Sequence, residues 1–104
     1  MPHITICGVP EQEAREATPG LLQALLDSTG VAAEHVKVLY SPLRRLDGPE
    51  EVAVDLFWFP RPQETCDRAA QAFTDYWKGR GYDYVRVTIT ECPASHYYEN
   101  GKHY

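Results

Sequence analysis

The sequence predicts an α/β (α+β) fold in which two fused β-α-β units form one four-stranded mixed sheet with two helices on one face. Each half of the chain holds a β-rich segment, an amphipathic helical segment and a second β-rich segment. Pro10 and Pro60 each close a strand and open a helix, and Val36-Lys37-Val38 corresponds in position to Val85-Arg86-Val87. A helix that crosses back over the sheet makes the two strands of each unit parallel.

The composition is that of one globular domain covering residues 1–104. Hydrophobic residues make up 43% and charged residues 24%, and the net charge is −5. This balance argues against nucleic acid or an anionic membrane as a partner. No apolar stretch approaches the roughly 20 residues that a transmembrane helix needs. The first residues lack the pattern of a signal peptide, so a cytoplasmic location is expected.

The first unit of the pseudo-repeat covers residues 1–48. Its first segment alternates and is rich in β-formers, and apolar side chains then follow at helical spacing. Pro19 lies inside that helical pattern and predicts a kink, or a restart with Thr18 as the N-cap. Gly30 ends the helix. The predicted elements are a strand at 3–7, a helix at 10–28, a strand at 36–40 and a loop at 41–50.

The second unit covers residues 49–104 and has a more apolar first strand. That strand is hydrophobic on nearly both faces, which predicts a central place in the sheet. Its helix presents an inward stripe that includes Cys66, Phe73 and Trp77. Asn100-Gly101 in the tail is a signal for a tight hairpin. The predicted elements are a strand at 52–59, a helix between Pro60 and Gly79, a strand at 84–91 and a tail at 96–104.

The two units share one sheet if their first strands meet antiparallel at its centre. Both helices then cover the same face and leave the other face bare. Val54, Leu56 and Trp58, or their neighbours in alternation, are more apolar than a bare face allows, so a partner subunit is expected.

The local motifs at the chain start and in the second unit resemble the tautomerase superfamily, which includes 4-oxalocrotonate tautomerase (4-OT) and macrophage migration inhibitory factor. Pro2 follows Met1 and directly precedes the first strand. Val85-Arg86-Val87-Thr88-Ile89-Thr90-Glu91, followed by His96-Tyr97, is similar to the substrate strand and turn of 4-OT. Arg61 stands where that family places its other substrate arginine. The segments 58–64 and 97–101 also resemble a small branch of this superfamily.

The resemblance implies a homotrimer that catalyses enol–keto isomerisation of a small unsaturated 2-oxo or 2-hydroxy acid, without metal or organic cofactor. Pro2 would be the general base, because a free and partly buried α-amine is neutral near pH 7. Arg61 and Arg86 would hold the anionic substrate through their planar guanidinium groups. Arg86 could come from a neighbouring subunit.

The resemblance also suggests three substrate-binding residues. Tyr97 matches the aromatic wall of the family motif, and Trp58 would help to keep the pocket dry. Lys37 takes the position in the first unit that Arg86 takes in the second, so the site would be a mixed one. No Cys or His pair has the spacing of a metal site, and the three cysteines are expected to be reduced.

Two other functions stay open at this stage. One is hydration or dehalogenation of small unsaturated acids, for which Glu91 would activate water. The other is a non-catalytic trimeric binding or signalling module. Retention of Met1 would favour the non-catalytic alternative, because the nitrogen of Pro2 would then be an amide and no base.

Overall fold

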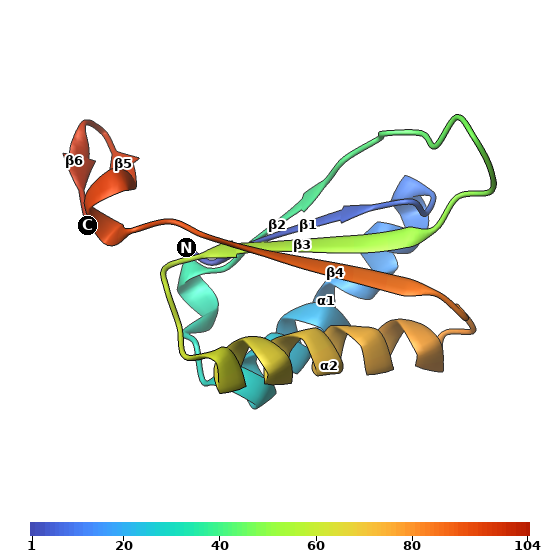
Figure 1. Cartoon of the computed structure of the whole chain (residues 1–104), viewed down its shortest axis with the longest axis horizontal. Helices are drawn as coiled ribbons and strands as arrows, with labels where there is room; N and C mark the ends of the chain where they lie inside the picture. The colour runs from blue at the N-terminus through green and yellow to red at the C-terminus, as the bar shows by residue number, and fades with distance from the viewer.

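A computed structural model describes all residues, Met1 to Tyr104. Each of the two helices connects two parallel strands, in the order that the sequence predicts (Figure 1). None of the helices is long and apolar enough to cross a membrane. The elements are β1 (His3–Cys7), α1 (Glu11–Thr29), η1 (Ala33–His35), β2 (Lys37–Tyr40), β3 (Val52–Trp58), α2 (Gln63–Gly79), β4 (Val85–Glu91), η2 (Ala94–His96), β5 (Tyr98–Glu99) and β6 (Lys102–His103).

The four long strands form one mixed sheet in the order β2-β1-β3-β4. β1 is parallel to β2, β3 is parallel to β4, and the central pair β1 and β3 is antiparallel. Both helices lie on one face of the sheet, α2 beside α1 (Figure 1). The predicted fold class and the central position of β3 are therefore confirmed.

The core lies between the sheet and the two helices. Val54, Leu56 and Trp58 of β3 point into it and are fully buried, as are Phe73 and Trp77 of α2. Burying a side chain of this size contributes roughly 1.5–3 kcal/mol, so this layer contributes strongly to the stability of the fold. The inward stripe that was predicted for α2 is the buried stripe that the structure shows.

The other face of the sheet differs from the expectation. Val54, Leu56 and Trp58 all face the helices, and the alternate positions of β3 place Asp55 and Phe57 on the uncovered face. The strict alternation of the strand explains the difference, because successive side chains point to opposite faces and the alternate row holds Ala53, Asp55 and Phe57. The uncovered face is therefore mixed in polarity, and its apolar character alone does not require a partner.

Helix α1 also departs from the expectation, because it continues through Pro19 without a break. Thr18 is not an N-cap, since its hydroxyl donates a hydrogen bond to the carbonyl oxygen of Ala14 at 2.9 Å. Pro19 is exposed, so water can hydrogen-bond to the carbonyl that the missing proline N–H leaves free. The buried residues of α1, which hold the helix on the sheet, are Ala14, Ala17, Leu21 and Leu25.

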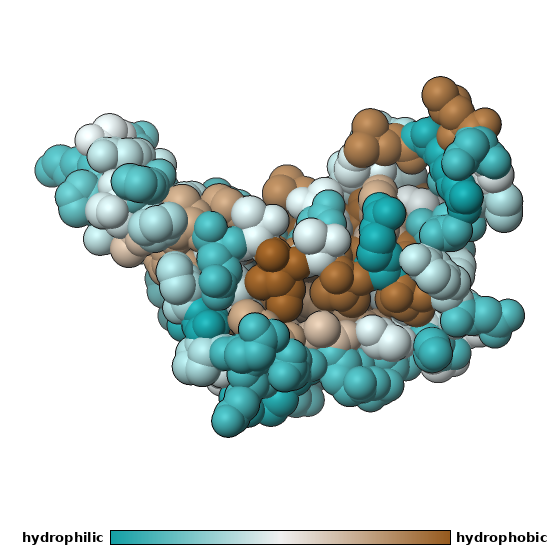
Figure 2. Space-filling view, viewed as in Figure 1, coloured by the Kyte–Doolittle hydropathy of each residue, from teal (hydrophilic) through white to brown (hydrophobic).

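Two segments project from the sheet on the side away from the helices (Figure 1). One is the loop between β2 and β3, which carries Leu43 and Leu46, exposed by 74% and 98%. The other is the C-terminal hairpin β5–β6, whose turn residues Asn100 and Gly101 have φ angles of 53° and 83°. The predicted hairpin is confirmed. Apolar atoms gather on the loop at one end of the molecule (Figure 2).

Gly8, directly after β1, is expected to tolerate no side chain. Its φ is +84°, and a Cβ there would lie 1.8 Å from the backbone oxygen of Glu51. Gly81 has a similar φ of +97° but open space around it. Gly8→Ala should therefore lose about 2 kcal/mol of unfolding free energy or more, and Gly81→Ala only the backbone strain of about 1 kcal/mol. Urea unfolding of both variants checks this, and equal losses would contradict the steric argument.

Candidate functional site

The start of β1 lies beside the end of β3, because His3 pairs with Phe57 in antiparallel register. The side chain of Pro2 is fully buried there, and Met1 is exposed by only 8%. A depression of about 260 Å³ opens at this place. It is lined by Met1, Pro2, Thr29, Gly30, Val31, Ala32, His35 and Arg61. The structure thus brings together Pro2 and Arg61, which were predicted from the sequence to belong to one site.

Arg61 has two contacts with the rest of the chain, and neither pairs its side-chain charge with an acid. Its guanidinium carbon lies 5.2 Å from the ring centroid of Trp58, and its backbone N–H donates to the carboxylate of Glu91 at 2.9 Å. The side-chain Nε is buried and has no hydrogen-bond partner. None of the salt bridges in the molecule includes Arg61. An unpaired guanidinium with a buried donor is suited to bind an anion.

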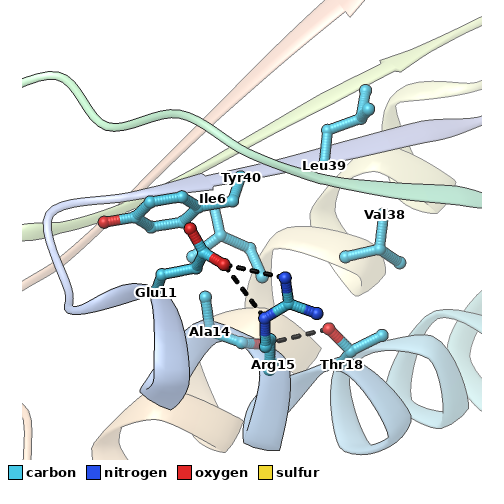
Figure 3. Close-up of a pocket in the computed structure, with 8 residues that line it drawn as sticks. All are labelled: Ile6, Glu11, Ala14, Arg15, Thr18, Val38, Leu39 and Tyr40. Carbon is cyan, nitrogen blue, oxygen red and sulfur yellow. Dashed lines mark hydrogen bonds and ion pairs between the residues drawn. The ribbon is translucent and has the colours of Figure 1, made fainter.

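A second depression lies between α1 and β2 (Figure 3). It provides a comparison, because its arginine is paired with a carboxylate. Its volume is about 400 Å³, larger than that beside Pro2. Arg15 lines it, but both Nε and Nη2 of Arg15 donate to the carboxylate of Glu11, at 3.0 and 2.8 Å. The floor is apolar, with Ile6 and Val38. This depression offers no free charge, so its size does not make it the better anion site.

Trp58 lies beneath Arg61 and is fully buried among the core residues. Its indole Nε1 has no hydrogen-bond partner. Trp58 is not among the residues that line the depression. It instead holds the guanidinium plane of Arg61, since the face of an indole ring attracts a cation.

Tyr97 lies on the helix-free side of β1 and does not line the depression. Its hydroxyl donates to Glu99 at 2.9 Å and lies 3.4 Å from Nε2 of His3. The hydrogen bond to Glu99 raises the pKa of Tyr97, and the hydrogen bonds from Tyr104 and Tyr97 lower the pKa of Glu99. Burial, followed by the positive N-terminus, lowers the pKa of His3. Tyr97 thus ties the C-terminal segment to β1.

The two basic strand residues stand at opposite ends of the sheet. Lys37 is at the Pro2 end, where its backbone N–H donates to the carbonyl oxygen of Pro2 at 3.1 Å. Arg86 pairs with Ala53, which pairs in turn with Cys7 at the far end of β1. Arg86 therefore borders another depression, of about 590 Å³, together with Arg44. A single chain does not bring Arg86 to Pro2 and Arg61.

His35 is a residue of the depression that sequence reasoning missed. It is the last residue of η1, and nothing in the local sequence distinguishes it from an ordinary exposed histidine. The only signal that could have found it is the pairing of β1 with β2, because β2 starts two residues later beside Pro2. No group of three or more His, Cys, Asp or Glu side chains is arranged to hold a metal ion.

The cysteines are all free, as the sequence predicted. Burial raises the pKa of the thiols of Cys7 and Cys66, and the nearby Asp55 and Glu91, respectively, add to the effect. Both thiols are therefore protonated near neutral pH and are poor nucleophiles.

Two β-α-β units in one sheet, with both helices on one face, give this chain the same fold as the solved structures of fused 4-OT and of macrophage migration inhibitory factor from Toxoplasma gondii. The chain belongs to the family described as a domain of unknown function, DUF1904, whose model matches residues 1–103. No curated protein matches the sequence.

Solved structures agree with this assignment. A DUF1904 protein from Sebaldella termitidis ATCC 33386 is 30% identical with a TM-score of 0.86, and the match covers 100% of both chains. A protein of unknown function from Vibrio cholerae O1 biovar eltor str. N16961 is 25% identical with a TM-score of 0.88, covering 99% of this chain and 87% of that one. The F6 fused 4-OT, described as an asymmetric trimer, is 19% identical with a TM-score of 0.81, covering 98% and 95%.

Proposed function

We propose that this chain, when Pro2 carries a free amine, catalyses enol–keto isomerisation of a small unsaturated 2-oxo or 2-hydroxy acid. The observation that carries the proposal is the unpaired Arg61 guanidinium in the same depression as Pro2. An amine that accepts a proton and a cation that holds a carboxylate are the two groups that this reaction needs.

Pro2 is the proton carrier in this proposal. Its ring is buried and its nitrogen stands at the start of β1, so the lone pair of a free amine has a fixed direction. Burial and the positive charge of Arg61 both disfavour the ammonium form, and we expect a pKa below the value of about 8 of an exposed α-amine. The neutral amine then takes a proton from the substrate and returns it to another atom.

Arg61 holds the substrate carboxylate. Trp58 supports its guanidinium from beneath, and Glu91 holds the backbone at the same residue. Because Glu91 already accepts the N–H of Arg61, it acts here on the position of Arg61 and is less suited to activate water. This contact favours isomerisation over the hydratase alternative.

We further propose a homotrimer in which a neighbouring subunit supplies Arg86. Three observations support this. Arg86 of β4 is level with Cys7, at the end of β1 away from Pro2, so it cannot reach Pro2 within one chain. The similar fused 4-OT is described as a trimer, and two segments of this chain project beside the helix-free face. In this arrangement, residues 1–48 and residues 49–104 are structural repeats that contribute different side chains to each site. Exposed Leu43 and Leu46 would pack on a neighbour.

The assembly is expected to be a trimer at micromolar concentration. Exposed leucines on a projecting loop are unfavourable in water, and burying them on a neighbour regains part of that cost. Sedimentation equilibrium on the full chain measures the mass of the particle, and Leu43→Ser with Leu46→Ser should shift it toward the monomer. A wild-type particle with the mass of one chain would contradict the proposed assembly.

Arg86→Ala is expected to weaken the binding of a small 2-oxo acid by about tenfold or more, because one charged contact to the anion is lost. Lys37→Ala should change it less than threefold, since the charge of Lys37 is already offset by the nearby carboxylate of Glu99. Calorimetric titration of both variants checks this. Equal losses would show that the two basic strand residues contribute alike.

The direct test of the function is ketonisation of phenylenolpyruvate, followed by its ultraviolet absorbance, with chain that starts at Pro2. Turnover above the rate in buffer supports the isomerase. Binding of the acid without turnover would support the alternative of a non-catalytic binding module with the same anion site. Absence of both binding and turnover would contradict the proposed site.

A further inference from the structure

We propose that His35 donates a hydrogen bond to the oxygen on the second carbon of the acid, the oxo or enol oxygen, while Arg61 holds the carboxylate. This inference rests on the proposed function and assigns a second polar contact within the same depression. It makes His35 the residue that distinguishes a 2-oxo acid from a simple carboxylic acid.

The backbone places His35 in the depression that Pro2 also lines. β2 is parallel to β1, His3 pairs with Lys37, and the N–H of Lys37 donates to the carbonyl oxygen of Pro2 at 3.1 Å. Two residues before Lys37, at the end of η1, His35 lines the same depression as Met1 and Pro2. The turn η1 fixes this position, since the N–H of His35 donates to Ala32 at 3.2 Å.

Within one chain, the residues around the depression leave His35 a role that no other side chain fills. Within one chain, no carboxylate lines it, and Arg61 is its one permanently charged side chain. Met1, Val31, Ala32 and Gly30 offer no polar side-chain atom at all. The hydroxyl of Thr29 already donates to the carbonyl oxygen of Leu25 at 2.7 Å. An imidazole always carries at least one N–H, so His35 can donate in either charge state.

The position suits the charge that develops during isomerisation. When the neutral amine of Pro2 takes a proton from carbon, the C–H bond breaks and its electron pair forms the C=C bond. The electron pair of the C=O bond moves onto the oxygen at the second carbon. A hydrogen bond from His35 stabilises that oxygen, and the proton then returns from Pro2 to another carbon of the ligand or to the oxygen. His35 gains and loses no proton in this sequence.

The experiment compares two ligands that differ in this oxygen. Pyruvate has a carboxylate and an oxo group, and propionate has the carboxylate alone. Their dissociation constants are measured by calorimetry with chain that starts at Pro2, so no turnover is required. Wild-type protein should bind pyruvate about fivefold more tightly than propionate, the ratio expected for one neutral hydrogen bond. His35→Leu should reduce this preference to about one, and leave propionate binding unchanged.

Matched variants separate recognition from structure. His96 is an equally exposed histidine at the end of η2, outside the depression, so His96→Leu should keep the wild-type preference. His35→Gln keeps an N–H donor and should retain part of it. The proposal is overturned if wild type shows no preference, if His35→Leu keeps it, or if that variant weakens both ligands equally. It is also overturned if glutamine does no better than leucine.

The outcome of this binding experiment can be distinguished from the outcome of the isomerase assay. Loss of the preference for pyruvate without any turnover of phenylenolpyruvate would support the role of His35 in binding and contradict catalysis. In an active protein, His35→Leu should lower kcat by about 100-fold, as removal of an oxyanion donor does. It should change the affinity for propionate less than twofold. A parallel loss of kcat in His96→Leu would contradict the assignment.

Discussion

A chain that retains Met1 in front of Pro2 is expected to lose nearly all isomerase activity. The peptide bond converts the nitrogen of Pro2 into an amide, which cannot accept a proton. A general base contributes roughly 10²–10⁴ to the rate, so kcat/KM on phenylenolpyruvate should fall by about that factor. Met1 also lines the depression beside Arg61, so its presence removes space from the ligand. Intact mass identifies the two forms, and the same assay measures both.

The pH dependence gives the second readout of the same prediction. The reaction needs the neutral amine, so kcat/KM should rise with pH through the pKa of Pro2, below the value of about 8 of a free α-amine. Pro2→Ala keeps an amine but loses the ring that fixes the direction of its lone pair. This variant should retain partial activity, and its kcat/KM should still rise with pH. A tag placed after Tyr104 is the control for added length. N-terminally blocked chain that is as active as free chain would exclude Pro2 from the mechanism.

Arg61→Ala is expected to reduce kcat/KM by about 10³, the second large effect. The variant leaves the ligand carboxylate without its charged partner in a partly buried site, a loss worth roughly 2–5 kcal/mol. Arg61→Lys should recover only part of it, because an ammonium lacks the planar pair of donors. Arg15→Ala is the matched control, since Arg15 is exposed and already paired with Glu11. Steady-state kinetics at one pH compares the three variants.

Stability measurements distinguish a loss of the binding site in these variants from a loss of folded protein. The side chain of Arg61 makes no hydrogen bond, and its removal loses only the contact with Trp58, worth about 0.5–1 kcal/mol, so the urea midpoint should fall only slightly. If Arg61→Ala binds propionate as tightly as wild type, then Arg61 is not the anion site. In that case the depression beside Pro2 loses its only permanent charge and the proposed function fails with it.

The topology could be predicted from the sequence because its signals are local and repeated. Two strands that end at Pro10 and Pro60, each followed by an apolar stripe at helical spacing, leave few ways to build one sheet. The neighbourhood of Pro2 and Arg61 followed from the antiparallel central pair, which the register of His3 with Phe57 bears out. The continuity of the helix through Pro19 could not be predicted from the sequence, because the exposure of one backbone carbonyl to solvent depends on the tertiary structure.

Side-chain positions in the site were harder to predict for a physical reason. A shift of one residue in a strand moves a side chain to the opposite face. Trp58 was expected at the pocket wall, yet its place in the alternation of β3 puts it in the core beneath Arg61. His35 belongs to a turn whose position depends on the pairing of β2 with β1, so its sequence neighbours carry no signal.

The central antiparallel pair has a consequence for stoichiometry. β1 and β3 lead the two β-α-β units, but in a chain that starts at Pro2 only β1 follows a free amine, since Val52 at the start of β3 is joined to Glu51 by a peptide bond. The two ends of the sheet therefore cannot carry equivalent amines, however similar their backbones are. Each polypeptide should take up one equivalent of an anionic ligand or of an amine-directed label at Pro2, and a threefold particle should saturate at three equivalents instead of six.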